Sequence, residues 1–235
     1  MSRNLIILPV YNRGSAINGI VTRIMDSLGD QTDLVVVDDG SDDSTAKKVK
    51  TSERVFCIAH EESLGYGAAL INGLQLAKDM GYDYAIAIDA MNPKSHYAFS
   101  PILRELAAGN SVVSCSRMTK EERGLDGEYS VVDTGSLVSS RINDVTGFSL
   151  IDPFSPYKGF SVRGIEPLQI EEYDENAVIQ LWIQSAHHGL PVKEIVCEDI
   201  HTGYIPEEEF LDRDQDHYLS FIDAEKILYP TEHAD

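Results

Sequence analysis

Two short apolar runs that each end abruptly in polar residues constrain the fold of this chain most. They lie at residues 5–12 (LIILPVYN) and residues 34–41 (LVVVDDGS). Continuous apolar runs of this length are typical of strands that are buried on both faces, as in a parallel sheet. In open α/β sheets, ligands bind beyond the carboxyl ends of such strands. The polar residues that end both runs are therefore predicted to lie at a binding edge.

Apolar spacing predicts that strands and helices alternate through the first half of the chain. Further strands are expected at residues 54–59, 82–88 and 111–116, and helices at residues 15–28, 44–49, 68–80 and 96–108. This alternation predicts an α/β fold with a mostly parallel sheet and helices on both faces. In the less regular second half, elements are expected at residues 131–145, 157–162, 176–188 and 192–197, after a loop at 118–129.

The charge balance excludes several classes of partner. The 235 residues include 39 Asp and Glu against 19 Lys and Arg, for a net charge of −20. Such a chain is poorly suited to nucleic acid, because neutralising phosphates requires clustered basic residues. The N-terminus shows no signal peptide, and no apolar run approaches the roughly 18 residues of a membrane helix. We expect a cytoplasmic protein without an integral membrane segment, and its oligomeric state, a homo-oligomer included, is left open.

The three cysteines are widely spaced and lie in apolar, strand-like stretches. They are Cys57, Cys115 and Cys197. Their spacing matches neither a disulfide framework nor a zinc site. We expect buried free thiols that pack as small hydrophobic groups.

The two apolar runs together resemble the opening of the family 2 glycosyltransferases. The first ends in Pro-Val-Tyr-Asn, and residues 37–45 follow the family pattern Val-Asp-Asp-Gly-Ser-x-Asp-x-Thr almost letter for letter. The resemblance covers roughly residues 4–200 and is nearest to dolichol-phosphate mannosyltransferase-like members. It implies the GT-A fold, a Rossmann-like α/β architecture. It also implies transfer of a sugar, with inversion in most relatives, from a nucleoside-diphosphate sugar to an acceptor that the sequence does not identify.

By this resemblance, the ends of the first two strands hold the base and ribose of the donor. The residues concerned are Pro9, Tyr11, Asn12, Asp38 and Asp39. Two carboxylates at a buried strand end lose hydration, which is unfavourable unless a partner compensates. The alternative is that the two aspartates cap a turn before the next helix.

A glycine-containing segment offers a second candidate contact with the donor. Residues 63–70 (SLGYGAAL) resemble the family's Gly-x-Gly-x-Ala helix start, which places Gly65 and Gly67 near the nucleotide sugar. Glycine lets a backbone approach a ligand closely, and a helix start offers free N–H groups. Taken separately, the segment also fits a tight turn.

The strand at residues 82–88 leads into a candidate catalytic and metal-binding position. Asp89 resembles the first acid of the family's Asp-x-Asp, which holds Mn²⁺ or Mg²⁺ against the donor diphosphate. The second acid is replaced by Met91, whose soft thioether suits these ions poorly. Three alternatives remain open: a metal held by Asp89 with a distant ligand such as His201, catalysis without a metal, or an inactive site.

Two further residues are candidates for catalysis because they resemble positions of the mannosyltransferase relatives. Arg117 follows a strand as in their Gly-Ser-Arg, where a guanidinium can stabilise phosphate charge. Asp152 opens a segment that resembles their Asp-Pro-x-Ser-Gly-Phe, interrupted here by residues 156–158. Asp152 is expected to orient the acceptor or to act as a general base. The alternatives are a loop-anchoring salt bridge for Arg117 and a structural turn for Asp152.

The sequence thus predicts a glycosyltransferase with one GT-A-like domain over residues 1–235. Residues 1–117 would form the nucleotide-sugar-binding half, and residues 118–235 the acceptor-side half with an acidic tail. A catalytically silent nucleotide-sugar-binding or scaffold protein on the same fold is the alternative. Three departures from the family pattern support it: Arg13, Met91 and Gln180.

Overall fold

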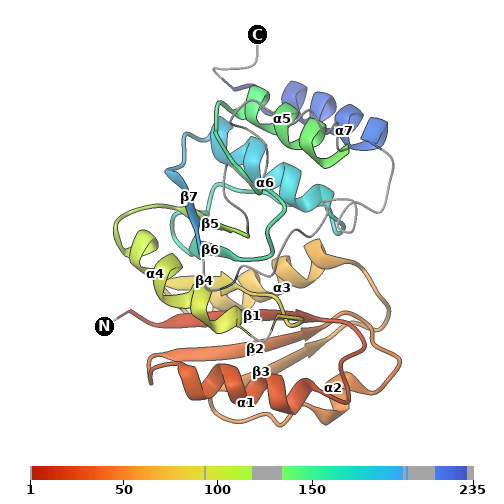
Figure 1. Ribbon diagram of the computed structural model, residues 1–235, viewed down its shortest axis with the longest axis vertical. Helices are drawn as coiled ribbons and strands as arrows, with labels where there is room; N and C mark the ends of the chain where they lie inside the picture. The colour runs from red at the N-terminus through yellow and green to blue at the C-terminus, as the bar shows by residue number, and fades with distance from the viewer. Residues whose placement is uncertain (1, 93, 118–133, 198–199, 201–214, 232–235) are drawn as a thin grey trace.

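One seven-stranded sheet organises the chain (Figure 1). The computed structural model describes residues 2–92, 94–117, 134–197, 200 and 215–231. The strand order is β3-β2-β1-β4-β6-β5-β7. The strands are β1 (Asn4–Val10), β2 (Thr32–Asp38), β3 (Val55–Ala59), β4 (Tyr84–Ala87), β5 (Val112–Ser116), β6 (Lys158–Ser161) and β7 (Val192–Val196). The helices are α1 (Ile17–Ser27), α2 (Thr45–Lys48), α3 (Tyr66–Asp79), α4 (Phe99–Ala107), α5 (Thr134–Thr146), α6 (Asn176–His187) and α7 (Gln215–Leu228), with a 3-10 turn η1 (Ser95–Ala98) before α4.

Helices cover both faces of the sheet, which explains why its strands are apolar on both sides. Side chains alternate along β1: Leu5 and Ile7 join the core with α3 and α6, whereas Ile6 and Leu8 join the core with α1 and α4. All four are at most 1% exposed. The predicted α/β fold with a mostly parallel sheet is confirmed.

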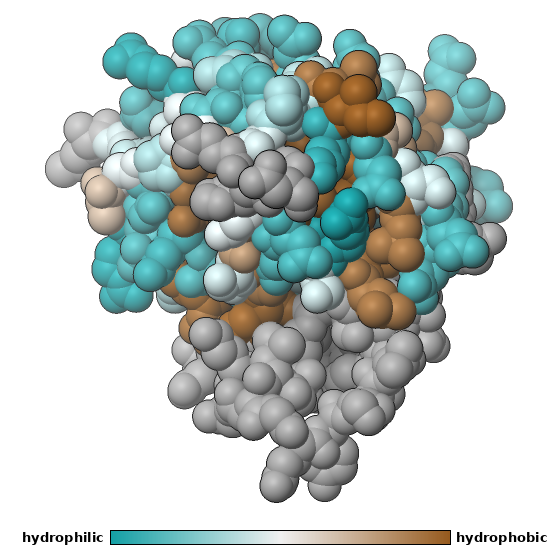
Figure 2. Space-filling view, turned by 90° about the horizontal axis from the view of Figure 1, so that it is seen from above, coloured by the Kyte–Doolittle hydropathy of each residue, from teal (hydrophilic) through white to brown (hydrophobic). Residues whose placement is uncertain are grey.

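The helices α5, α6 and α7 pack on one another at the upper end of the molecule in Figure 1. Ten of the twelve residues of α6 are buried, as expected for an inner helix. Figure 2 views this end from above and shows a mainly hydrophilic surface with small hydrophobic patches. Within the described residues, none of the helices combines the length and the apolar character needed to cross a membrane.

Strand β6 departs from the parallel pattern. It lies between β4 and β5 and runs antiparallel to both, with Phe160 paired to Ala85 on one side and to Val112 on the other. The other paired strands of the sheet run parallel. The carboxyl ends of β1, β2, β4 and β5 therefore meet at one edge.

The structure corrects the expectation that the three cysteines are free thiols. Cys115 and Cys197 form a disulfide, with a Cα–Cα distance of 6.0 Å, while Cys57 is free. The pairing follows from the sheet, because β5 and β7 are adjacent and parallel, and Ser116 is in register with Val196. The 82 residues between the two cysteines concealed this proximity in the sequence.

Candidate active site

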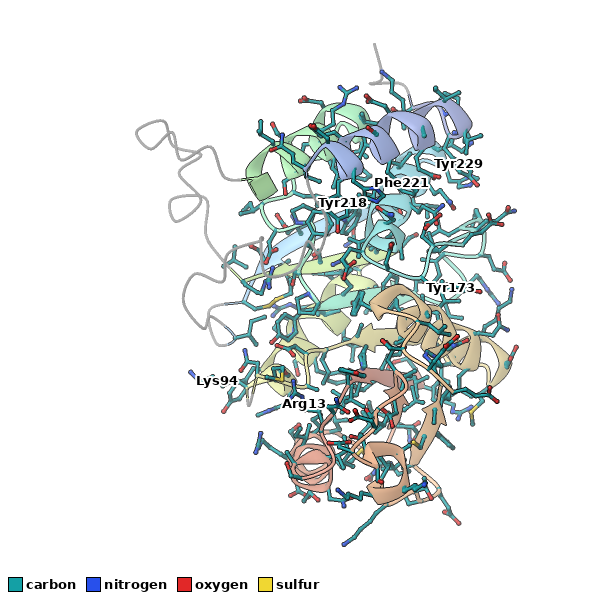
Figure 3. All side chains as sticks on the ribbon, turned by 90° about the vertical axis from the view of Figure 1, so that its right-hand side faces the viewer. Arg13, Lys94, Tyr173, Tyr218, Phe221 and Tyr229 are labelled. Carbon is teal, nitrogen blue, oxygen red and sulfur yellow. A yellow bond between two sulfur atoms is a disulfide. The ribbon has the colours of Figure 1, made fainter. Side chains whose placement is uncertain are left out.

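Most of the predicted site residues come together at the carboxyl edge of the sheet. β1 and β2 end in register, with Val10 paired to Asp38. On the other side of β1, the last paired residue of β4, Ala87, precedes Asp89 by two positions. Strand β5 points the same way as β4 and runs directly into Arg117. The sheet thus places the candidate residues of four strands on one side of the molecule, the side that faces the viewer in Figure 3.

Both carboxylate oxygens of Asp38 accept hydrogen bonds from neighbouring residues of the protein. Its Oδ1 accepts hydrogen bonds from the backbone N–H and the hydroxyl of Ser41, and its Oδ2 accepts one from Ala46 N at 2.8 Å. The side chain is buried. These contacts close the loop after β2 and satisfy an N–H in the first turn of α2, which is the capping role. A contact with the donor stays a prediction for Asp38, and its geometry matches the structural alternative.

Asp39 is held in the same way by the segment before α3. Its Oδ1 accepts Leu64 N at 2.9 Å and lies 2.7 Å from His60 Nδ1, while its Oδ2 accepts Ser63 Oγ at 2.7 Å and Gly65 N at 3.0 Å. Burial favours the neutral form, but the hydrogen bonds outweigh burial and hold the pKa of Asp39 below its ordinary value. Four donors occupy this carboxylate, so it fastens the loop.

The residues that follow β1 differ in how free they are. Asn12 is fixed, because its N–H donates to Ser41 Oγ at 2.8 Å and its Oδ1 accepts Asp42 N at 3.1 Å. Pro9 lies within β1, in register with Val37. The side chain of Tyr11 is 50% exposed at the edge. Of the predicted residues in this segment, Tyr11 has the most surface to offer a base or ribose.

Gly65 and Gly67 face the protein rather than open space. A Cβ on Gly65, whose φ is +108°, would lie 2.6 Å from Tyr173 O. A Cβ on Gly67 would lie 2.6 Å from the Cβ of Ala177 and 2.8 Å from Asp174 O. All three distances are too short for a real side chain. The glycines therefore let α3 begin against the backbone before α6, and their predicted contact with the donor stays a prediction.

Asp89 has a different environment. Its Oδ1 accepts Met91 N at 2.7 Å, and burial raises the pKa of Asp89 although this bond and the charges of Arg117 and Arg13 act against the shift. The Met91 side chain is 63% exposed. Asp89 is thus a half-buried carboxylate on which the positive charges of Arg117 and Arg13 act.

Arg117 and Asp152 form a buried ion pair. Arg117 Nε donates to Asp152 Oδ2 at 2.7 Å, Nη2 donates to Oδ1 at 2.8 Å, and the backbone N–H of Arg117 donates to Oδ2 at 3.0 Å. Asp152 is 0% exposed and Arg117 is 5% exposed. Burial would raise the pKa of Asp152, but Arg117 holds it below the ordinary value. A fully buried carboxylate with both oxygens engaged positions Arg117, which matches the structural alternative; a general-base role stays untested.

Two side chains that the sequence reasoning missed, the half-buried Glu194 and the buried Lys158, support this pair. Glu194 accepts Asp152 N at 2.9 Å and Ile151 N at 2.6 Å, which fixes the backbone around the aspartate. Lys158 is fully buried in β6, and its Nζ donates to Ser155 O. Burial lowers the pKa of Lys158 to about 7, although Asp152 acts in the opposite direction. The lysine at the start of β6, between Tyr157 and Gly159, was the one signal that the sequence offered.

The metal-binding expectation rests on Asp89 alone within the described part of the chain. His201 lies outside the described residues. Among the residues that are described, no group of three or more His, Cys, Asp or Glu side chains is arranged to hold a metal ion. A carboxylate oxygen is a suitable ligand for Mn²⁺ or Mg²⁺, and such ions commonly take further ligands from substrate phosphates and water.

Two curated relatives are similar to this chain in sequence. A curated relative, UDP-N-acetylglucosamine--dolichyl-phosphate N-acetylglucosaminyltransferase of Methanococcus voltae, is 24% identical over 220 residues, covering 85% of this chain and 86% of the relative. The polyprenol monophosphomannose synthase of Mycolicibacterium smegmatis is 22% identical over 201 residues, covering 82% and 76%.

Solved structures agree in fold. Glucosyl-3-phosphoglycerate synthase of Mycobacterium tuberculosis in complex with phosphoglyceric acid superposes with a TM-score of 0.68 and 16% identity, covering 95% of this chain and 80% of that one. The model of the family described as "Glycosyl transferase family 2" matches residues 5–161, which is more than half of the chain. The chain therefore belongs to glycosyl transferase family 2 and is a glycosyltransferase of the GT-A fold.

Proposed function

We propose that the protein transfers a sugar from a nucleoside-diphosphate sugar to an acceptor at the carboxyl edge of the sheet, with Asp89 at the centre. The observation that carries this proposal is the environment of Asp89, a desolvated carboxylate on which the positive charges of Arg117 and Arg13 act. Mixed charge of this kind suits a substrate whose diphosphate must be held and then released.

Two guanidinium groups near Asp89 would stabilise the charge that develops on the leaving diphosphate. Arg117 is held by Asp152 through two side-chain hydrogen bonds, so its orientation is set before a substrate binds. Arg13 is half-buried, and its guanidinium makes a long contact of 3.5 Å from Nη1 to Asn12 O. Preorganised charge at a diphosphate is an effective source of rate because little reorganisation is needed during the reaction.

We also propose that Asp89 binds Mn²⁺ or Mg²⁺ together with the donor. The hard carboxylate oxygen of Asp89 suits such an ion, whereas the exposed thioether of Met91 does not. A divalent ion would neutralise diphosphate charge. One structure of the mycobacterial synthase is a complex with Mn²⁺, UDP-glucose and phosphoglyceric acid, which supports the proposal by analogy of fold.

The acceptor is proposed to carry an anionic oxygen. Asp152 is fully buried and bound to Arg117, so it is not free to remove a proton from an acceptor hydroxyl. A phosphate oxygen already carries negative charge and needs no base. The Methanococcus voltae relative is named for dolichyl phosphate, which has such an oxygen. The acceptor then attacks the anomeric carbon while the bond to the diphosphate breaks.

Calorimetry with UDP and GDP, each with and without Mn²⁺, tests the proposal. We expect one nucleotide to bind, with an affinity that Mn²⁺ increases, and the matching nucleotide sugar to be consumed when a polyprenyl phosphate is added. Binding without hydrolysis or transfer to any acceptor would instead favour the catalytically silent protein, which the replacement of the second acid by Met91 also suggests. Absence of any nucleotide binding would refute both.

A further inference from the structure

The hydroxyl of Tyr66 is buried at the edge of the sheet and lacks a hydrogen-bond partner among the described residues. Buried tyrosine hydroxyls normally find a partner, because an unsatisfied buried polar group is unfavourable. Two other tyrosines of this protein follow the rule. Tyr82 donates to Asp33 Oδ2 at 2.6 Å, and the hydroxyl of Tyr157 lies 3.4 Å from Ser95 Oγ. The unpaired hydroxyl of Tyr66 therefore needs an explanation.

The surroundings of Tyr66 belong to the candidate active site. Burial raises the pKa of Tyr66, the negative charge of Asp89 raises it further, and the positive charge of Arg117 lowers it. The hydroxyl thus stays protonated and can donate a hydrogen bond. The hydroxyl lies within electrostatic range of Asp89, a carboxylate that suits a metal ion, and of Arg117, a guanidinium that suits a phosphate.

The backbone that carries Tyr66 is held on both sides. Tyr66 is the first residue of α3, and the preceding residue, Gly65, donates its N–H to Asp39 Oδ2 at 3.0 Å. Two residues later, Ala68 N donates to Tyr173 O at 3.0 Å. These bonds fix the start of the helix before any ligand arrives, so the hydroxyl is presented in a set direction. Its missing partner is better explained by an absent ligand than by a mobile backbone.

We propose that Tyr66 donates its phenolic hydrogen bond to a phosphate oxygen of the bound nucleotide sugar, beside Asp89. This inference rests on the proposed function and adds a residue to it that the family pattern did not indicate. Phosphate oxygens only accept hydrogen bonds, which matches a hydroxyl that stays protonated. The geometry assigns to Tyr66 the role of a donor-binding residue, whereas the neighbouring Gly65 and Gly67 pack against protein.

The test compares Tyr66→Phe with wild type and with Tyr82→Phe as a matched control. Tyr82 loses the same hydroxyl, but its partner Asp33 lies next to the amino end of β2. We expect Tyr66→Phe to weaken binding of the nucleoside diphosphate and of the nucleotide sugar by about tenfold or more, as for a lost hydrogen bond to a charged group. Tyr82→Phe should bind both like wild type.

A stability measurement separates ligand binding from a structural role. Because the Tyr66 hydroxyl has no partner in the described part of the protein, Tyr66→Phe should unfold at the same urea concentration as wild type or at a higher one. A lower midpoint would show that the protein itself uses the hydroxyl, which overturns the inference.

The binding results have equally distinct meanings. If Tyr66→Phe binds both ligands as tightly as wild type does, the inference is overturned. The proposed function is unaffected by that result, because wild type still binds both ligands. Loss of affinity for the nucleotide sugar alone moves the contact from the phosphate to the sugar and overturns the phosphate assignment. If wild type binds neither ligand, the proposed function fails and this inference fails with it.

Discussion

The acids at the ends of β2 and β4 both follow buried parallel strands, but their environments in the protein differ. At the end of β2, the four carboxylate oxygens of Asp38 and Asp39 all accept hydrogen bonds from the protein. At the end of β4, Asp89 accepts a bond of 2.7 Å from Met91 N and has cationic neighbours. Burial lifts the pKa of Asp89, whereas hydrogen bonds lower the pKa of Asp39.

This difference shows that a motif does not reveal whether its polar groups serve the fold or a ligand. A carboxylate whose oxygens are saturated by internal donors holds a loop in place, and ligand contacts must then come from the surface that the loop presents. A carboxylate that is desolvated without full compensation has interaction capacity left for a ligand. Counting internal partners distinguishes the two, and the sequence does not supply that count.

The largest expected effect is on catalysis at the β4 end. Asp89→Asn keeps the shape and the acceptor for Met91 N but removes the charge. We expect sugar transfer to fall by at least about 100-fold, the scale of a lost electrostatic group in an active site. Steady-state rates with a nucleotide sugar measure this effect. Near-normal turnover would remove Asp89 from the centre of the site.

The second effect concerns stability at the β2 end. Asp39→Ala leaves the N–H groups of Leu64 and Gly65 without their acceptor, so the free energy of unfolding should fall by about 3 kcal/mol. Urea denaturation measures it. Asp42→Ala is the control, because Asp42 is exposed and its substitution should stay within about 0.5 kcal/mol. Equal stability of the two variants would contradict the structural role of Asp39.

A third effect tests whether the glycine segment serves packing. Gly67→Ala places a methyl group 2.6 Å from the Cβ of Ala177, so we expect a loss of about 1–3 kcal/mol in the free energy of unfolding. Gly19→Ala in α1 meets no atom within 4 Å and should gain about 0.5–1 kcal/mol from helix propensity. Nucleotide affinity of folded Gly67→Ala should be unchanged. A selective loss of affinity with normal stability would return Gly67 to the donor site.

The smallest effect is a pH dependence of opposite sign at the two strand ends. Asp39, with a lowered pKa in the folded state, stabilises the fold above the ordinary value near 3.8, and this contribution is lost as the pH falls through its folded pKa. Asp89, with a raised pKa, lowers stability once the pH rises above 3.8.

Two variants resolve these contributions in urea titrations between pH 3 and 7. Asp89→Asn should therefore be more stable than wild type at pH 7 and equal to it at the acidic end, whereas Asp39→Asn should be less stable at pH 7 and approach wild type on acidification. The same sign for both variants would show that the two carboxylates have equivalent environments.

Much of the fold followed from the sequence because apolar periodicity reports burial directly. The runs that became β1, β2 and α3 were located to within a few residues, and the carboxyl edge followed from the parallel arrangement. The antiparallel direction of β6 and the Cys115–Cys197 bond were not accessible, since both depend on which strands become neighbours.

The site was predictable only as a location. The sequence predicted that Asp38, Asp39 and Asp89 lie at one edge of the sheet. It could not show which of these carboxylates accept hydrogen bonds from the protein on both oxygens. Tyr66 was not predicted, because it occupies the variable position between the two glycines of the Gly-x-Gly-x-Ala pattern. Its significance depends on a missing partner, which only coordinates reveal.

The position of β6 has a consequence for how the chain can be divided. Because β6 comes from residues beyond 157 yet lies between β4 and β5, a fragment that stops at residue 117 would leave β4 as an open edge and β5 detached from it. Such edges favour aggregation. The segments before and after residue 117 thus contribute strands to one continuous sheet, and we expect them to unfold in a single cooperative step.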